Sequence, residues 1–88
     1  MMDLKSSTAV VTGAGRGLGA AISQSLVEEG VKVYGIARSR SDLKILSDRL
    51  GSGFVGVPLD LTDKDAVKNW VDKEFDKSFP DILINNAG

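Results

Sequence analysis

Cysteine and histidine are both absent from this chain of 88 residues. Without cysteine the chain has no disulfide and no thiolate nucleophile, and without histidine it has no Ser–His pair. The usual zinc-binding patterns are excluded with them, so we expect no metal site. The lack of cysteine is compatible with a reducing compartment, and we expect a cytoplasmic protein.

The chain also lacks a long apolar run and an excess of charge of either sign. No apolar stretch approaches the roughly 20 residues that a membrane helix needs, and the first residues, MMDLKSS, have no apolar segment of the signal-peptide kind. The 11 basic and 12 acidic side chains nearly cancel, so no bulk field favours nucleic acid or an anionic membrane. We therefore expect no nucleic-acid partner and no membrane partner.

Short β-branched apolar runs alternate with helical patterns along the chain. Strands are predicted at residues 7–12, 31–37, 54–59 and 81–85. Helices are predicted at residues 17–29, 41–50 and from residue 62 onward. This β-α-β-α-β-α-β order predicts an α/β fold, namely half of a Rossmann-type doubly wound parallel sheet with right-handed crossovers.

Side-chain spacing predicts how the helices begin and pack. In the first helix Leu18, Ile22 and Leu26 recur every four residues and predict a buried stripe. Ser41 is predicted to cap the second helix, and Thr62 is predicted to open the third in a capping box with residue 65.

Pro58 constrains the position of the third strand. Because proline has no N–H to donate to a sheet ladder, Pro58 favours an edge strand, unless it only ends the strand. An edge position for the third strand matches the strand order 3-2-1-4 of a doubly wound sheet.

The stretch TGAGRGLG, residues 12–19, lies where the first strand gives way to the first helix. The first N–H groups of a helix point outward unpaired, and the helix dipole adds partial positive charge there. Gly13 suits a tight turn, Gly17 the close approach of a phosphate, and Gly19 close packing of the helix on the sheet. The glycines thus predict an anion held by the main chain, or else a plain tight connection. A P-loop is disfavoured, because no Gly-Lys pair followed by a hydroxyl residue is present.

Three motifs at the ends of predicted strands resemble the short-chain dehydrogenase/reductase family: TGAGRGLG, DL at 60–61 and NNAG at 85–88. The resemblance runs along the whole chain, as the N-terminal part of such an oxidoreductase, and implies a nicotinamide cofactor and a carbonyl/alcohol substrate pair. By similarity Asp60 accepts a hydrogen bond from the adenine amino group and Leu61 lies beside the ring. The alternative for Asp60 is a solvated loop aspartate. By similarity Asn85 ties the central strands together and residues 86–88 line the ribose.

The residues after the second strand affect the choice between NAD and NADP. Enzymes that use NAD commonly place an acid about 20 residues beyond the glycine turn, where this chain has Ala37 and Arg38. Arg38 and Arg16, with the Ser39 hydroxyl, are suited to bind a 2′-phosphate. We therefore expect NADP rather than NAD, the alternative being that both arginines face solvent.

The predicted cofactor-binding residues come from all of these motifs. They are Gly13, Gly15, Arg16, Gly17, Leu18, Gly19, Ala37, Arg38, Ser39, Asp60, Leu61, Asn86, Ala87 and Gly88.

No catalytic residue is predicted. The family's chemistry implies a Y-x-x-x-K motif, but the single tyrosine, Tyr34, is followed four residues later by arginine and lies in a predicted strand. We expect residues 1–88 to be an incomplete dinucleotide-binding part of a Rossmann domain, which is an NADP-dependent oxidoreductase when complete. The alternative is a non-catalytic dinucleotide-binding module or an inactive remnant. The apolar fourth strand has a free side, which predicts a homo-oligomer or a missing C-terminal half.

Overall fold

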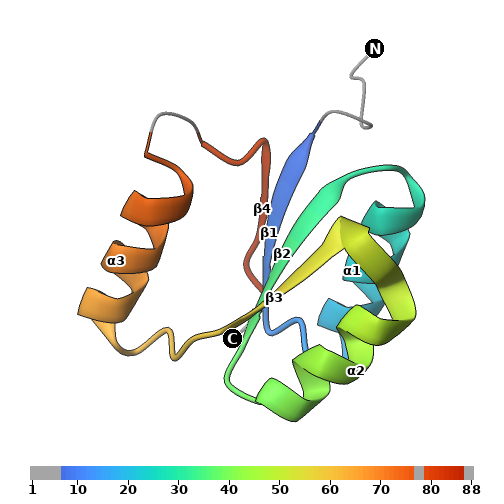
Figure 1. Cartoon of the computed structure of the whole chain (residues 1–88), viewed down its shortest axis with the longest axis horizontal. Helices are drawn as coiled ribbons and strands as arrows, with labels where there is room; N and C mark the ends of the chain where they lie inside the picture. The colour runs from blue at the N-terminus through green and yellow to red at the C-terminus, as the bar shows by residue number, and fades with distance from the viewer. Residues whose placement is uncertain (1–6, 77–78, 87–88) are drawn as a thin grey trace.

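The structure is a computed structural model that describes residues 7–76 and 79–86. Strands and helices alternate along the chain, as predicted (Figure 1). The elements are β1 (Thr8–Thr12), α1 (Gly17–Glu28), β2 (Lys32–Ala37), α2 (Arg40–Leu50), the 3₁₀ turn η2 (Gly51–Gly53), β3 (Phe54–Pro58), α3 (Lys64–Glu74) and β4 (Ile82–Ile84).

The four strands form one parallel sheet in the order β3-β2-β1-β4, which confirms the predicted order 3-2-1-4. In the register of the central strands Val10 lies opposite Tyr34 on one side and Leu83 on the other. Pro58 ends β3 at the edge of the sheet, opposite Ala37. Its missing N–H therefore costs no ladder bond there.

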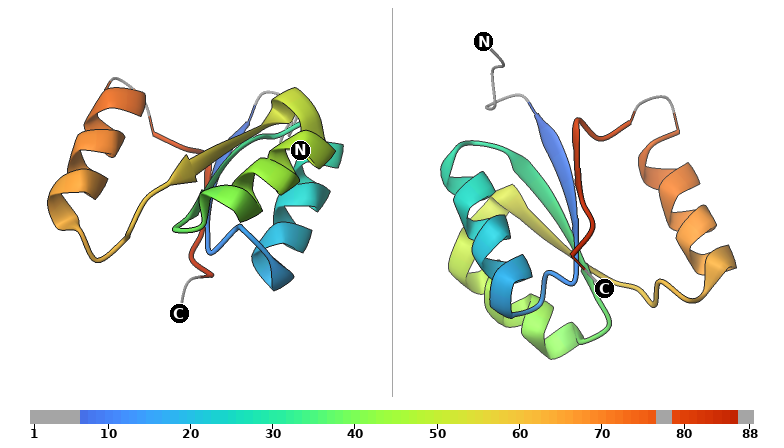
Figure 2. Two further views of the ribbon diagram at one scale, coloured as in Figure 1. Left: turned by 60° about the horizontal axis from the view of Figure 1, so that its bottom comes forward. Right: turned by 180° about the vertical axis from the view of Figure 1, so that it is seen from behind.

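Helices α1 and α2 cover one face of the sheet, and α3 lies over the other (Figure 2). The main core fills the space between the sheet and α1 and α2. It includes Val11, Val31 and Val33 with Leu43 and Leu46 of α2. Each of these side chains is at most 3% exposed, so this face is closed by the part of the chain that the structure describes.

The α3 face is covered less completely. Its buried residues are Val10, Ile36 and Val57, whereas none of the α3 residues, all of which are described, is buried. The contact with α3 is aromatic: the rings of Tyr34, Trp70 and Phe75 meet edge to face, with centroids 5.5 to 5.9 Å apart. Tyr34 is thus a packing residue, as its place in a strand predicts.

The predicted buried stripe of α1 is wrong at its first position. Leu18 is 66% exposed, and the buried residues of α1 are Gly19, Ala20 and Ser23. The cause is the closeness of the helix to the β1–α1 turn, where a Cβ on Gly19 would collide with the carbonyl group of Gly13. Small residues therefore fill the contact, and the buried Ser23 hydroxyl donates to the Gly19 carbonyl at 2.9 Å.

Both predicted helix caps are displaced by one or two residues. Helix α2 is capped by Ser39, whose Oγ accepts from the Asp42 N–H at 3.2 Å, so the Ser41 cap is wrong. Helix α3 is capped by Asp63, whose Oδ1 accepts from the Ala66 N–H at 3.1 Å, so the capping box is wrong too. In each case the capping residue has the extended backbone that a cap requires.

Candidate functional site

The β1–α1 turn has an unusual backbone. Gly13 and Gly17 have φ angles of 63° and 62°, in the left-handed region that glycine adopts without a steric cost. The Ala14 N–H donates to the Ile36 carbonyl at 3.1 Å, which ties the turn to β2. A Cβ on Gly17 would meet no described atom within 4 Å. The turn is therefore held from the sheet side and open on its outer side.

The N-terminus of α1 is open as well. Among the described residues no side chain caps it, and its first turn, residues 17–20, contains no acid. The first backbone bond into the helix runs from the Ala20 N–H to the Arg16 carbonyl at 3.4 Å. The amides of residues 17–19 precede that bond, and such groups with the helix dipole behind them favour an anion.

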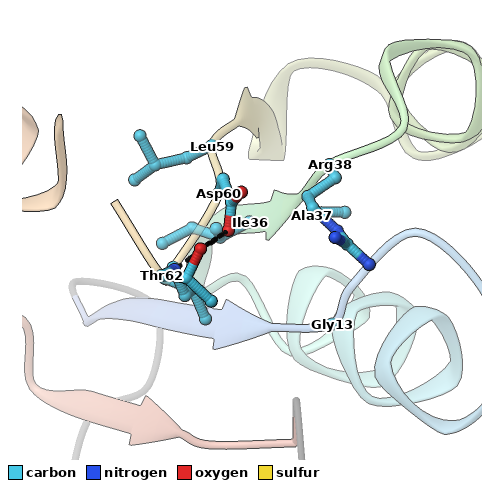
Figure 3. Close-up of a pocket in the computed structure, with 8 residues that line it drawn as sticks. Gly13, Ile36, Ala37, Arg38, Leu59, Asp60 and Thr62 are labelled. Atoms are coloured by element: carbon cyan, nitrogen blue, oxygen red, sulfur yellow. Dashed lines mark hydrogen bonds between the residues drawn. The ribbon is translucent and has the colours of Figure 1, made fainter. Parts of the chain in front are cut away.

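A hollow of about 480 Å³ lies at the carboxyl ends of β1, β2 and β3 (Figure 3). Five of the residues that line it were predicted from the sequence: Gly13, Ala37, Arg38, Asp60 and Leu61. In an open α/β sheet, ligands bind at this end of the strands.

Asp60 is held in place by its own loop. Its Oδ1 accepts hydrogen bonds from the Thr62 N–H at 2.9 Å and the Thr62 hydroxyl at 2.7 Å (Figure 3). These bonds, and more weakly the positive charge of Arg38, lower the pKa of Asp60 below 3.8. The carboxylate is therefore ionised at neutral pH and is oriented as a hydrogen-bond acceptor at the hollow.

A second hollow, of about 410 Å³, adjoins the first and shares Gly13, Ala37 and Arg38 with it. It adds the predicted residues Gly15, Arg16 and Ser39, together with Asp42. Arg16, Arg38 and Ser39 therefore line one depression. The Arg16 side chain is 89% exposed, and its Nε lies 3.7 Å from Oδ2 of Asp42.

The remaining predicted residues are distributed around the hollows. Leu18 lines neither of them, and Gly19 is buried beneath the turn, where it serves packing. Asn86 donates from its backbone N–H to the Thr12 hydroxyl at 2.9 Å and from its side chain to the Gly13 carbonyl at 3.4 Å. Ala87 and Gly88 lie outside the described residues.

Asn85 ties the ends of the central strands together, as the family resemblance implied. Its Oδ1 lies 3.2 Å from Oγ1 of Thr12, at the end of β1. The end of β4 is thus fixed beside the glycine turn.

Four residues at the hollows were not predicted: Ile36, Asp42, Leu59 and Thr62. Thr62 could have been predicted, because the side chain of an aspartate commonly accepts a hydrogen bond from the backbone N–H two residues further on. No sequence feature predicts the contact of Asp42 with Arg16, because that contact depends on how α2 packs beside the α1 turn.

Comparison with known proteins agrees with this geometry. The parallel α/β sheet and the open glycine turn are features that open α/β proteins use to bind dinucleotides. The family model for short chain dehydrogenases matches residues 7–88, and the chain belongs to that family. Members of this family bind a dinucleotide cofactor.

The chain is similar to two curated enzymes in particular. It is 41% identical over 90 residues to the 3-oxoacyl-(acyl-carrier-protein) reductase FabG of Salmonella typhimurium, covering 99% of this chain and 36% of the relative. It is 45% identical over 85 residues to the serine 3-dehydrogenase of Rhizobium radiobacter, covering 94% and 34%. The chain thus spans about a third of the length of these relatives.

Solved structures show the same fold. A short chain dehydrogenase/reductase family protein superposes with a TM-score of 0.86 at 33% identity, covering 99% of this chain and 36% of that one. A short chain dehydrogenase from Bacillus anthracis superposes with a TM-score of 0.84 at 24% identity, covering 99% and 37%, and supports the fold alone. Within residues 7–76 and 79–86 no helix is long and apolar enough to cross a membrane, and no cluster of acidic side chains suits a metal.

Proposed function

We propose that this chain is the N-terminal, NADP-binding part of an oxidoreductase that interconverts a carbonyl and an alcohol. One observation carries the cofactor assignment. Arg16, Arg38 and Ser39 line a single hollow, beside a helix N-terminus that no described side chain caps. Two guanidinium groups and a hydroxyl suit a phosphate monoester, whereas a ribose 2′-hydroxyl would need an acceptor there.

Each part of the cofactor has residues suited to it. The pyrophosphate would be held by main-chain amides after Gly15, and the adenine would lie in the larger hollow, with its amino group donating to Asp60 and Leu61 beside the ring. Arg16 and Arg38 would bind the 2′-phosphate. Asn86, Ala87 and Gly88 would line a ribose.

The reaction class rests on the family and its relatives. The names of the two relatives describe reduction of a 3-oxoacyl group and dehydrogenation of serine at carbon 3. The cofactor, when bound, would supply or accept the hydride. The residues of this chain would bind and orient it, and we assign no catalytic role to any of them. Tyr34, packed between Trp70 and Phe75, does not serve as a catalyst in this proposal.

The free side of β4 supports an incomplete domain. β4 is an end strand of the sheet formed by the described residues, so one of its edges is unpaired there, and such an edge on an apolar strand invites pairing. The side chain of Leu83, in the middle of β4, is also 67% exposed on one face of the sheet. We propose that either further chain of the same domain or a second copy covers it. A cytoplasmic location, compatible with the absence of cysteine, completes the proposal.

A titration of the folded chain tests the cofactor assignment. We expect NADPH to bind more tightly than NADH, and Arg38→Ala to weaken NADPH binding about tenfold, because a hydrogen bond to a charged group contributes about 1.5 kcal/mol. Lys73→Ala removes the same charge from an exposed site in the last turn of α3, on the other face of the sheet, and is the matched control. Equal affinity for the two cofactors, or equal effects of the two variants, would contradict the assignment.

A second test separates an enzyme from a binding module. The intact mass of the protein and the reading frame after the codon for Gly88 are determined together. A downstream Y-x-x-x-K motif supports the oxidoreductase, and a stop codon supports the non-catalytic module.

A further inference from the structure

Asp42 places a negative charge where we propose a phosphate binds. Its side chain lines the smaller hollow with Arg16, Arg38 and Ser39 and is 32% exposed. Its Oδ2 lies 3.7 Å from Nε of Arg16. An acid is thus already paired with one of the two arginines that the phosphate would use.

The position of Asp42 is set by its surroundings. Its backbone N–H is bound by the Ser39 cap at 3.2 Å, in the first turn of α2. Its Cβ packs against Gly15, where an added Cβ would come within 3.2 Å of it. The carboxylate therefore stays at the hollow, while the exposed Arg16 side chain has more freedom to move.

From this arrangement we infer that Asp42 competes with the 2′-phosphate for Arg16 and so limits the preference of this site for NADP over NAD. The inference rests on the proposed function. When the 2′-phosphate enters, Arg16 either leaves Asp42 or is shared between two anions. With NAD no such exchange is needed, and the Arg16–Asp42 pair persists.

The expected effect is modest. Exposed ion pairs contribute roughly 0.2–1 kcal/mol, and the remaining repulsion between carboxylate and phosphate is screened by solvent. Removing the Asp42 charge should therefore tighten NADPH binding roughly two- to fivefold. Asp42 would thus affect the choice between NADP and NAD without contacting the reacting ring of the cofactor.

Dissociation constants for NADPH and NADH in Asp42→Asn test the inference, with Asp48→Asn as control. Asp48 lies on the same helix, and its carboxylate pairs with Lys44 at 3.4 Å, outside the hollow. We expect tighter NADPH binding in Asp42→Asn alone, and no gain when Arg16→Gln is also present. If the Asn variant does not fold, Asp42→Ser removes the same charge and replaces it in the test.

The outcomes separate the inference from the function it rests on. If the wild-type chain binds NADPH and NADH equally, the NADP assignment fails and the inference fails with it. If the wild type prefers NADPH but Asp42→Asn leaves NADPH binding unchanged or weaker, the inference alone is overturned. A gain that persists in Arg16→Gln, or a preference that rises only because NADH binds less tightly, also overturns it.

Discussion

The three junctions from strand to helix are built in two different ways. At the β2–α2 and β3–α3 junctions a side chain of the loop caps the helix, Ser39 in one and Asp63 in the other. Each of these helices also has an acid in its first turn, Asp42 or Asp65. At the β1–α1 junction the described residues provide neither a cap nor an acid. Two helices thus complete their own N-termini, and the third is the one at which we propose that an anion binds.

The backbone of the open junction explains why it cannot simply be capped. Arg16 stands at the N-cap position with an extended backbone, at φ −161°, but its side chain has no acceptor to offer the amides. Gly17 follows it in the left-handed region with open space beside it. A ligand oxygen can therefore approach the amides that Ser39 and Asp63 cover elsewhere.

Gly19→Ala should have the largest effect, because it disrupts the packing of the β1–α1 junction and so lowers the stability of the fold. The new methyl would collide with the main chain of Gly13 and residue 14, so the helix would have to move off the turn. Overpacking of this kind costs about 3 kcal/mol, and urea unfolding should shift to much lower concentration or be lost. Ser25→Ala, at an exposed position of α1, is the control; the packing account is contradicted if the two variants unfold alike.

Gly17→Ala should weaken cofactor binding about tenfold for NADPH and NADH together. The methyl would occupy the space through which the pyrophosphate approaches, and the left-handed φ costs an alanine about 1 kcal/mol. Gly30→Ala controls for that strain, because Gly30 also has a positive φ, 88°, and is exposed just beyond the C-terminal end of α1, away from the hollows. Calorimetric titrations measure both variants. Similar cofactor binding by the two variants would show that Gly17 is needed only for its positive φ and not for the space beside it.

Ser39→Ala should destabilise the ligand-free chain by about 1 kcal/mol, the usual contribution of a helix cap. Asp63→Ala should do the same for α3. Arg16→Ala should destabilise the chain less, because Arg16 caps no helix and the variant loses only the exposed ion pair with Asp42. Thermal unfolding without cofactor compares the three. An effect of Arg16→Ala as large as that of Ser39→Ala would mean that the open junction is capped after all.

Thr62→Val should have the smallest effect, a rise in the pKa of Asp60 toward 3.8, because the hydroxyl bond is lost and the backbone bond stays. The lowered pKa means that Asp60 stabilises the fold above pH 3.8 and that this contribution is lost as the pH falls through the folded-state pKa. Carboxyl NMR titration measures the shift, and Thr62→Ser should restore the wild-type value. An unchanged pKa in the Val variant would show that the Thr62 hydroxyl does not lower the pKa of Asp60.

Much of the fold could be predicted, because strand and helix periods differ and the glycine turn marks their first junction. The cap positions could not, since Ser39 and Ser41 are equally good caps by residue type, and Thr62 and Asp63 are both common cap residues. Only the local backbone decides between them. The exposure of Leu18 was missed for a related reason: the closeness of α1 to the turn selects glycine and alanine, and a four-residue spacing carries no information on that distance.

The residues of the candidate site likewise fall into those that the sequence could predict and those that it could not. Residues that share a motif, such as Gly13 and Gly17 or Asp60 and Leu61, could be found from the sequence. The contact of Asp42 with Arg16 could not, because it joins two loops through the packing of α2.

Amide NMR shifts on addition of NADPH test the central claim most directly, because each of the three helix N-termini reports separately. The account predicts large shifts for the amides of Gly17, Leu18 and Gly19, and small ones for the first turns of α2 and α3 beyond the residues of the hollow. Shifts confined to other amides, with residues 17–19 unmoved at saturating NADPH, would contradict it.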